Sequence, residues 1–246
     1  MIKWLLSTQP WVIAHRGASG YAPENTIPAM QRAKEMGATW VEFDVVLSRD
    51  GELFVFHDEK LNRTTNGSGL IAQTDAAQIK LLDAGAWFSS LYKNTSTPTL
   101  DMILSYLAEV GLGMNLEIKP ADDRIELLVN KIFDAIERHW TNELPPPLIS
   151  SFSIPALYAA RKRSPTARLG LLLHEWRKDW RKIADDLNCY SVHLNMEIIT
   201  KRRIQAIHSS GRPVLCYTVN NSGVAKQLFD MGVDGIFSNY PDLMEK

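Results

Sequence analysis

The chain has 246 residues, of which 45% are hydrophobic and 22% are charged, and its formal net charge at pH 7 is −1. This composition is ordinary for a globular protein built as one large α/β domain or two small ones. A net charge near zero argues against a nucleic-acid-binding protein, because such proteins usually carry an excess of basic residues.

Two cysteines, Cys189 and Cys216, are too few to suggest a disulfide framework and fit a reducing compartment. The N-terminal apolar run is only Trp4-Leu5-Leu6, whereas a signal peptide needs about 7–15 apolar residues. No segment of the sequence approaches the roughly 18 apolar residues of a membrane-spanning helix. We therefore expect a cytoplasmic protein that does not span a membrane.

Short apolar runs alternate with helical patterns along the chain. The patterns predict strands over residues 11–15, 40–47, 113–119, 147–152, 168–173, 190–195, 213–219 and 233–238. They predict helices over 25–37, 99–110, 122–139, 154–163, 179–187, 200–209 and 222–231. Strands that alternate with helices imply a parallel sheet, and a closed (β/α)8 TIM barrel is the economical fold at this length. An open doubly wound sheet is the alternative, but the glycine-rich dinucleotide-binding motif is missing after the first strand.

The interval after the second predicted strand breaks this alternation. About 50 residues, roughly 48–98, stand where a short connection would be enough. Long insertions at one end of a regular scaffold are often functional. No linker, low-complexity segment or further repeat divides the chain. We expect a single domain over residues 1–246 that carries this insertion.

Acidic residues share one face of the second predicted strand, WVEFDVVL. Side chains alternate in a strand, so Glu42 and Asp44 point into the barrel together, and the same alternation directs Glu117 and Lys119 inward from the third strand. Buried carboxylates repel one another and lose hydration, so they need a neutralising partner. Three acids with few nearby Cys or His ligands favour one hard divalent cation, Mg²⁺ or Ca²⁺ with Mn²⁺ also suitable, over Zn²⁺. A buried cluster of salt bridges with Lys119 and Arg16 is the alternative.

A predicted hairpin places a histidine beside these acids. Asp50-Gly51 is a strong signal for a two-residue turn, and that turn would put His57 directly opposite Asp44. Directly opposed residues have Cβ atoms about 4.5–5.5 Å apart. The hairpin therefore predicts that His57 lies against the carboxylates.

Basic and titratable side chains complete the predicted site. His15 ends the first strand, so we expect it at the C-terminal rim of the barrel with His57, where the active sites of such barrels lie. Histidine can accept or donate a proton near neutral pH. Arg16 and Lys119 can hold phosphate oxygens, the arginine as a fork and the lysine as a point charge. This set of residues predicts acid–base chemistry on a phosphate.

A series of short motifs runs through nearly the whole chain. The motifs are HRG at 15–17, PENT at 23–26, EFD at 42–44, HDEKLNRTTNG at 57–67, LEIK at 116–119, YTVN at 217–220 and NYPD at 239–242. Together they closely resemble the glycerophosphodiester phosphodiesterases. The stretches LLLHEWR at 171–177 and VHLN at 192–195 resemble the soluble bacterial members in particular.

The resemblance implies a (β/α)8 barrel with a small subdomain after the second strand. It implies metal-dependent hydrolysis of glycerophosphodiesters to an alcohol and sn-glycerol 3-phosphate, and therefore a small-molecule substrate. It implies these roles by motif: His15 and His57 as the acid–base pair, Glu42, Asp44 and Glu117 as metal ligands, and Arg16 and Lys119 as phosphate contacts. We expect no nucleic-acid partner, and a monomer or homodimer.

Other positions bear on the substrate pocket. His193 and Asn195 share an inward face of the sixth predicted strand and are candidates for substrate contact. Tyr217 stands where many family members have tryptophan, and Ser238-Asn239 where many have Thr-Asp. We expect these departures to change the shape of the pocket and to lie outside the metal and histidine set.

Two other functions remain open at this stage. A phospholipase C-like or lysophospholipase D-like hydrolase of lipid diesters would need an apolar rim or a membrane-binding stretch, and the sequence shows no targeting segment or exposed amphipathic helix. A barrel that binds a phosphodiester without cleaving it needs no acid–base pair, so the two histidines argue against it. The fold alone does not decide, because barrels host many chemistries.

Overall fold

The computed structural model describes residues 11–244, so the N-terminal run Trp4-Leu5-Leu6 lies outside the described residues. The strands are β1 Trp11–His15, β2 Trp40–Leu47, β3 Leu53–Val55, β4 Gly113–Ile118, β5 Leu148–Ser151, β6 Arg168–Leu173, β7 Ser191–Asn195, β8 Val214–Tyr217 and β9 Gly235–Ser238. The α-helices are α1 Ile27–Glu35, α2 Ala76–Ile79, α3 Leu100–Val110, α4 Ile125–His139, α5 Ile154–Arg163, α6 Trp180–Asp186, α7 Lys201–His208 and α8 Ser222–Asp230. The short 3₁₀ helices are η1 Ile71–Gln73, η2 Ser90–Tyr92 and η3 Met196–Ile198.

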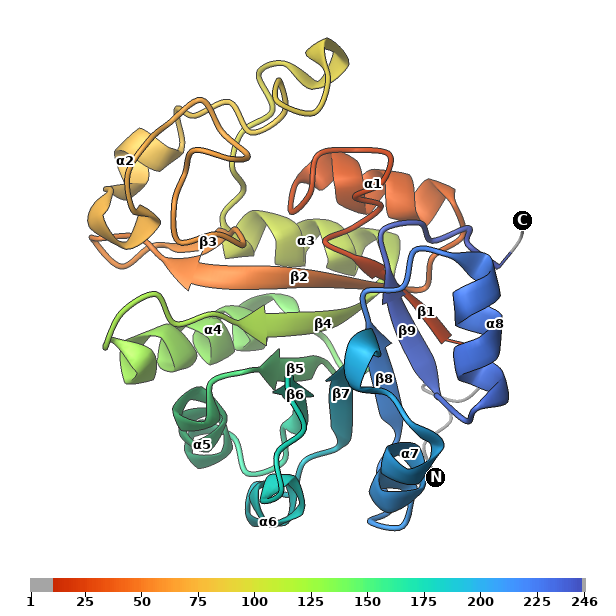
Figure 1. Ribbon diagram of the computed structural model, residues 1–246. Helices are drawn as coiled ribbons and strands as arrows, with labels where there is room; N and C mark the ends of the chain where they lie inside the picture. Colours follow the sequence, from red (N-terminus) through yellow and green to blue (C-terminus); the bar gives the residue numbers. More distant parts are fainter. Residues whose placement is uncertain (1–10, 245–246) are drawn as a thin grey trace.

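The sheet closes on itself as a barrel. Its strands follow the order β1-β9-β8-β7-β6-β5-β4-β2, and β1 also pairs with β2. The pairs around this ring are parallel, and helices surround it (Figure 1). The prediction of a (β/α)8 TIM barrel is therefore confirmed, and each strand and helix expected from the sequence is present. Between residues 11 and 244 the longest apolar helices fall short of what crossing a bilayer would require.

The inside of the barrel is apolar at one end and polar at the other. On β2, Val41, Phe43 and Val45 pack under the helices in the main core, while Glu42 and Asp44 occupy the opposite face. A separate apolar cluster fills the interior near the starts of several strands: Trp11, Ile13, Trp40, Leu148, Leu215 and Phe237. Because this cluster plugs the N-terminal end, polar chemistry is confined to the C-terminal rim.

Several helices begin at a side chain that caps the backbone. The oxygens of Thr26, Thr99, Ser153, Thr200 and Asn221 each accept a backbone N–H of the following first turn. Such caps satisfy donors that the helix itself leaves unpaired. They fix where each helix starts after its strand or loop, and therefore how each loop leaves the rim.

Residues 48–98, where the sequence predicts an insertion, contain β3, η1, α2 and η2. Figure 1 shows this orange and yellow segment beside β2 and β3, apart from the helices that follow β4. The insertion packs around an apolar cluster of its own: Val46, Phe54, Phe56, Leu61, Ile71, Ala76 and Ile79. The strand β3 is antiparallel to β2, so the hairpin expected at this point exists.

The register of this hairpin differs from the prediction by one residue. Val45 pairs with Val55, and the Ser48 N–H donates to the Glu52 carbonyl over 2.9 Å, so residues 49–51 form a three-residue loop. Gly51 has a φ of 84°, the left-handed conformation that closes such a loop with a bulge. The Asp-Gly signal was therefore correct for a turn and wrong for its length.

The shifted register changes how His57 reaches the rim. The Phe56 N–H, not the following residue, donates to the Asp44 carbonyl over 3.0 Å. The prediction that His57 lies directly opposite Asp44 is therefore wrong. Strand β3 ends at Val55, so the alternation of side chains along a strand no longer fixes the direction of His57. The His57 side chain nevertheless lines a cavity together with Glu117.

Gly17 shapes the loop that follows His15 and Arg16. It has a φ of 77°, and a Cβ at this position would lie 2.6 Å from the backbone carbon of Ala29 in α1. Both the backbone conformation and the close approach to the helix require a glycine. This contact fixes the direction in which the chain leaves β1.

Replacing Gly17 with alanine should lower the free energy of unfolding more than the same replacement at Gly37. Gly37 also has a positive φ, 80°, but open space surrounds the position of its missing Cβ. The difference, about 1–3 kcal/mol, is the usual cost of overpacking. Urea unfolding of the two variants measures it, and equal losses would show that α1 moves aside without cost.

Candidate active site

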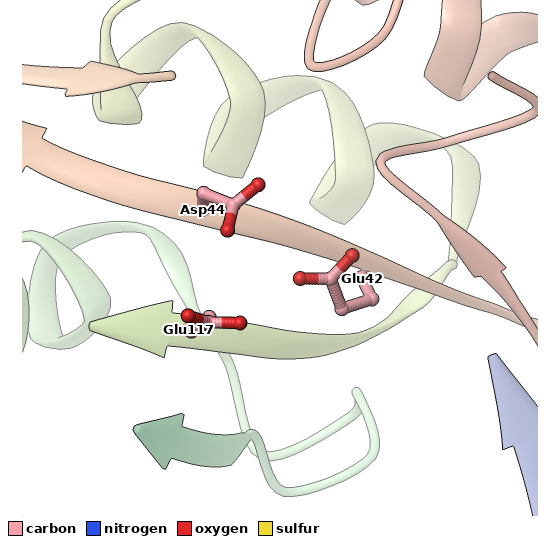
Figure 2. Close-up of side chains that lie close together, drawn as sticks. All are labelled: Glu42, Asp44 and Glu117. Carbon is pink, nitrogen blue, oxygen red and sulfur yellow. The ribbon is translucent and has the colours of Figure 1, made fainter. Parts of the chain in front are cut away.

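Three carboxylates gather at the rim from two neighbouring strands. Glu42 and Asp44 lie on β2, and Glu117 lies on β4 at the position paired with Asp44. The three residues are 3%, 1% and 8% exposed, and one oxygen from each lies within 4.8 Å of the others. Figure 2 shows the two β2 carboxylates beside the one from β4. The strand alternation read from the sequence therefore brings these acids together.

The surroundings of the three acids differ in charge. Burial and repulsion by Asp44 and Glu117 raise the pKa of Glu42 well above its usual value. Burial, with Asp44 beside it, also raises the pKa of Glu117 to about 7. Burial acts in the same direction on Asp44, but Arg16 and Lys119 outweigh it and lower the pKa of Asp44. The cluster thus carries like charges that repel one another.

Basic side chains offset only part of this charge. Arg16 Nε lies 3.3 Å from Asp44 Oδ2, but its Nη1 donates to Glu24 Oε1 over 2.7 Å. Lys119 Nζ lies 3.8 Å from Asp44 Oδ1 and 3.4 Å from Glu117 Oε1. The alternative of a salt-bridge cluster is therefore realised in part. Because one of these two cations also serves Glu24, the donor set fits an added divalent cation.

Two histidines lie near the acids, and each is held by a neighbouring side chain. His15 Nδ1 lies 2.7 Å from Asn239 Oδ1, and its Nε2 lies 3.9 Å from Glu42 Oε2. His57 Nδ1 lies 2.6 Å from Asp58 Oδ1. A carboxylate oxygen only accepts, so the His57 Nδ1–H donates and its Nε2 is left for the site. Both imidazoles are held at Nδ1 by an oxygen of another residue.

The histidines are neutral at rest in this environment. Burial lowers the pKa of His15 to about 4, and the charge of Arg16 acts in the same direction. Burial also lowers the pKa of His57, although Asp44 opposes this effect. A neutral imidazole can accept a proton at neutral pH, which general base catalysis requires.

Two adjoining cavities meet at these side chains. A small one of about 140 Å³ lies in the mouth of the barrel and is lined by His15, Arg16 and Glu42 among others. A larger groove of about 730 Å³ runs toward the insertion and is lined by Asp58 and residues 118–121. Both are lined by His57, Glu117, Lys119 and Phe152. The site can therefore hold one part of a ligand in the small cavity and another part in the large groove, with these four shared residues between them.

Comparison with known proteins identifies the family of this barrel. A sequence model of the glycerophosphoryl diester phosphodiesterase family matches residues 15–243. The chain belongs to this family. The resemblance drawn from the motifs, and with it the prediction of a phosphodiesterase enzyme, is confirmed.

Individual relatives support the assignment to this family. A glycerophosphodiester phosphodiesterase of Caldanaerobacter subterraneus is 33% identical over 95% of both chains. One of Bacillus subtilis is 33% identical over 95% of this chain and 85% of its own length. The structure of a phosphodiesterase of Oleispira antarctica in complex with the product sn-glycerol-3-phosphate matches with a TM-score of 0.93 and 37% identity, covering 96% of this chain and 95% of that chain.

The candidates on β7 of this phosphodiesterase family member differ in placement. His193 is fully buried and lines the small cavity, where its Nε2 lies 2.8 Å from Ser191 Oγ and burial lowers its pKa to about 3. Asn195 uses its side chain locally. Its Oδ1 accepts from the Glu197 N–H at the start of η3, and its Nδ2 lies 3.2 Å from His174 Nδ1. The structure therefore brings His193 to the site and engages the Asn195 side chain with Glu197 and His174 instead.

Some residues that contact the predicted site residues were given no contact with them from the sequence. Asn25 Nδ2 donates to Asp44 Oδ2 over 2.9 Å, and Asn239 contacts His15. The expectation that position 239 lies outside the histidine set is therefore wrong. Asp58, in the same way, holds His57. These residues belong to the PENT, NYPD and HD motifs, so their presence in a motif was the available signal.

Replacing Glu42 with glutamine should stabilise the protein in the presence of a chelator. Burial and the neighbouring acids disfavour the ionised form of Glu42, and an amide carries no charge, so the variant avoids this penalty; relief of such strain at a functional site is commonly worth about 0.5–2 kcal/mol. Urea unfolding in chelator measures the change. Glu109→Gln, at an exposed position on α3, is the control and should change nothing. A Glu42 variant less stable than wild type would contradict the repulsion inferred here.

Proposed function

We propose that the protein hydrolyses glycerophosphodiesters to an alcohol and sn-glycerol 3-phosphate with the help of one divalent cation. The observation that carries this proposal is the convergence of two histidines, two basic side chains and two carboxylates on one cavity, with the third carboxylate, Asp44, within 4.8 Å of the other two. The related Oleispira phosphodiesterase, solved with sn-glycerol-3-phosphate, supports the choice of substrate. The reaction adds one water across a P–O bond.

Glu42, Asp44 and Glu117 would hold the cation. Their donor atoms are all carboxylate oxygens, which favours Mg²⁺, Ca²⁺ or Mn²⁺ over metals that prefer nitrogen or sulfur ligands. When bound, the ion would supply positive charge that polarises the phosphorus and offsets charge in the transition state.

Arg16 and Lys119 would bind the phosphate oxygens. Both side chains lie at the wall of the small cavity, and each is already close to Asp44. A planar guanidinium can contact two phosphate oxygens at once, and an ammonium adds a compact charge. They would stabilise negative charge as it develops on the phosphate during the reaction.

We infer different roles for the two histidines from the cavities that they line. His15 lines only the small cavity, so we place the glycerol part there and make His15 the base that removes a proton from the attacking oxygen. His57 also borders the large groove, so we make it the acid: its Nε2 takes up a proton from solvent before each turnover and gives it to the leaving alkoxide as the bond to phosphorus breaks, while His15 afterwards returns the proton that it accepted to solvent. Attack by the neighbouring glycerol hydroxyl, followed by water opening a cyclic phosphate, and direct attack by water both use this arrangement. His193, in the small cavity, would contact the glycerol part.

Activity should depend on a divalent cation. We expect release of sn-glycerol 3-phosphate from glycerophosphocholine to stop after chelation and to return when Mg²⁺, Mn²⁺ or Ca²⁺ is restored. A coupled assay for sn-glycerol 3-phosphate measures this, and lysophosphatidylcholine assayed in parallel tests the lipid-diester alternative. No turnover of either substrate with any ion would favour a barrel that only binds phosphodiesters.

Replacing either His15 or His57 with alanine should lower kcat by about 10²–10⁴-fold, the usual worth of general acid–base catalysis. The roles separate with a glycerophosphodiester that carries a nitrophenol leaving group, which needs no acid. On this substrate we expect His57→Ala to recover much of its rate and His15→Ala to stay slow. His139→Ala, at a surface histidine paired with Asp101, is the control. Recovery by the His15 variant instead would reverse the two roles.

A further inference from the structure

Arg63 of the insertion holds two carboxylates at once. Its Nε and Nη2 donate to the two oxygens of Asp58 over 2.7 and 2.8 Å. Its Nη1 and Nη2 donate to the two oxygens of Glu24 over 2.8 and 2.7 Å. Four of the five N–H groups of the guanidinium are therefore used in two forked contacts. Such a double fork fixes the plane and position of both carboxylates.

Each of these carboxylates also holds a residue of the active site. Asp58 accepts from His57 Nδ1, and Glu24 accepts from Arg16 Nη1 over 2.7 Å. Arg16 in turn lies against Asp44. One guanidinium thus stands at the junction of two branches, one that ends at the proposed acid and one that ends at a proposed phosphate contact.

The charges along both branches are well defined. The hydrogen bonds from Arg63 lead the effects that lower the pKa of Asp58, so this carboxylate is ionised and can only accept from His57. Burial disfavours the charged form of Glu24, but hydrogen bonds from Arg63 and the charge of Arg16 outweigh it and lower the pKa of Glu24. The Glu24 side chain is only 12% exposed, whereas that of Arg63 is 45% exposed. The arginine therefore closes the network from the solvent side.

We propose that Arg63 is a positioning residue that sets the orientation of both His57 and Arg16, through Asp58 and Glu24. This inference rests on the function proposed above. It explains why the insertion is joined to the rim at this point by charged groups rather than by apolar contacts. Arg63 does not touch the reacting atoms, and its effect on the reaction is transmitted through the two carboxylates.

A purely structural role for Arg63 makes a different prediction. The insertion packs around its own apolar cluster, in which Leu61 is 1% exposed, so its fold does not require the arginine. A half-exposed ion pair contributes little to stability. If Arg63 only fastened the insertion, its loss would lower stability and leave the kinetic constants of the folded enzyme unchanged.

The test compares Arg63→Gln with Arg49→Gln. Arg49 also forms a forked contact within this region, to Asp75, but that pair lies on the surface and makes no contact with the site. We expect Arg63→Gln to lower kcat for glycerophosphocholine by about 10–100-fold, the usual effect of losing a partner that orients an active-site ligand. We also expect KM to rise because Arg16 loses its fixed position. Arg49→Gln should keep both constants within twofold of wild type, and both variants should keep the wild-type unfolding midpoint.

A lysine at position 63 tests the geometry separately from the charge. Arg63→Lys keeps the positive charge but cannot make two forked contacts, so we expect it to remain impaired. It also serves as the test variant if Arg63→Gln does not fold. Full activity in Arg63→Lys would overturn the proposal, since charge alone would then be enough.

Double-mutant cycles follow the two branches. If Arg63 acts on His57 through Asp58, adding Arg63→Gln to an Asp58→Asn variant should lower kcat only slightly further. If Arg63 acts on Arg16 through Glu24, adding Arg63→Gln to a Glu24→Gln variant should raise KM less than it does in the wild type. Additive losses in both backgrounds would overturn the proposal. The proposal would also be overturned if the wild type is active and the Arg63→Gln variant has the same kcat and KM as the Arg49→Gln variant. A wild type that turns over no glycerophosphodiester would instead refute the proposed function, so the two failures are distinguishable.

Discussion

The burial of three carboxylates within 4.8 Å of one another at the rim of the barrel is the constraint on which the site depends. Burial, together with like charges this close, raises the pKa of Glu42 and Glu117 and opposes folding unless something offsets the charge. The protein supplies two cations, of which Arg16 is shared with Glu24. A site that keeps this excess of negative charge is prepared for a cation and a charged substrate, at the expense of stability in their absence.

The loops around the rim are built to hold this cluster. The Arg16 N–H donates to Glu42 Oε2 over 3.0 Å from a backbone with a φ of 55°, and Asn25 contacts Asp44 with a φ of 59°. These left-handed conformations are uncommon outside glycine and concentrate at functional sites. The loop after β1 is therefore strained at the two residues that contact the acids, and the glycine that follows Arg16 lets this loop pack closely on α1.

The insertion after β2 contributes more than one side chain. It delivers His57 to the boundary between the small cavity and the large groove, and through Arg63 it contacts Glu24 in the loop after β1. Most of its apolar side chains form a cluster apart from the main core, which Leu53 and Val55 of β3 join, so the part of the insertion after β3 can vary with less effect on the barrel. This separation explains how a regular scaffold can carry a specialised rim.

The sequence by itself determined the barrel, the inward face of each acidic strand and the residues from which the site is built. These features follow from local rules, since alternation along a strand and caps at helix ends depend on nearby residues. Tertiary structure decided the hairpin register, where the bulge at Gly51 puts Phe56 instead of His57 opposite Asp44. It also decided which polar side chains hold the histidines: Asn239 reaches His15 across 224 positions of sequence, and Arg63 joins Asp58 to Glu24. Contacts of this kind depend on how distant loops meet when the barrel closes, and no local pattern encodes that meeting.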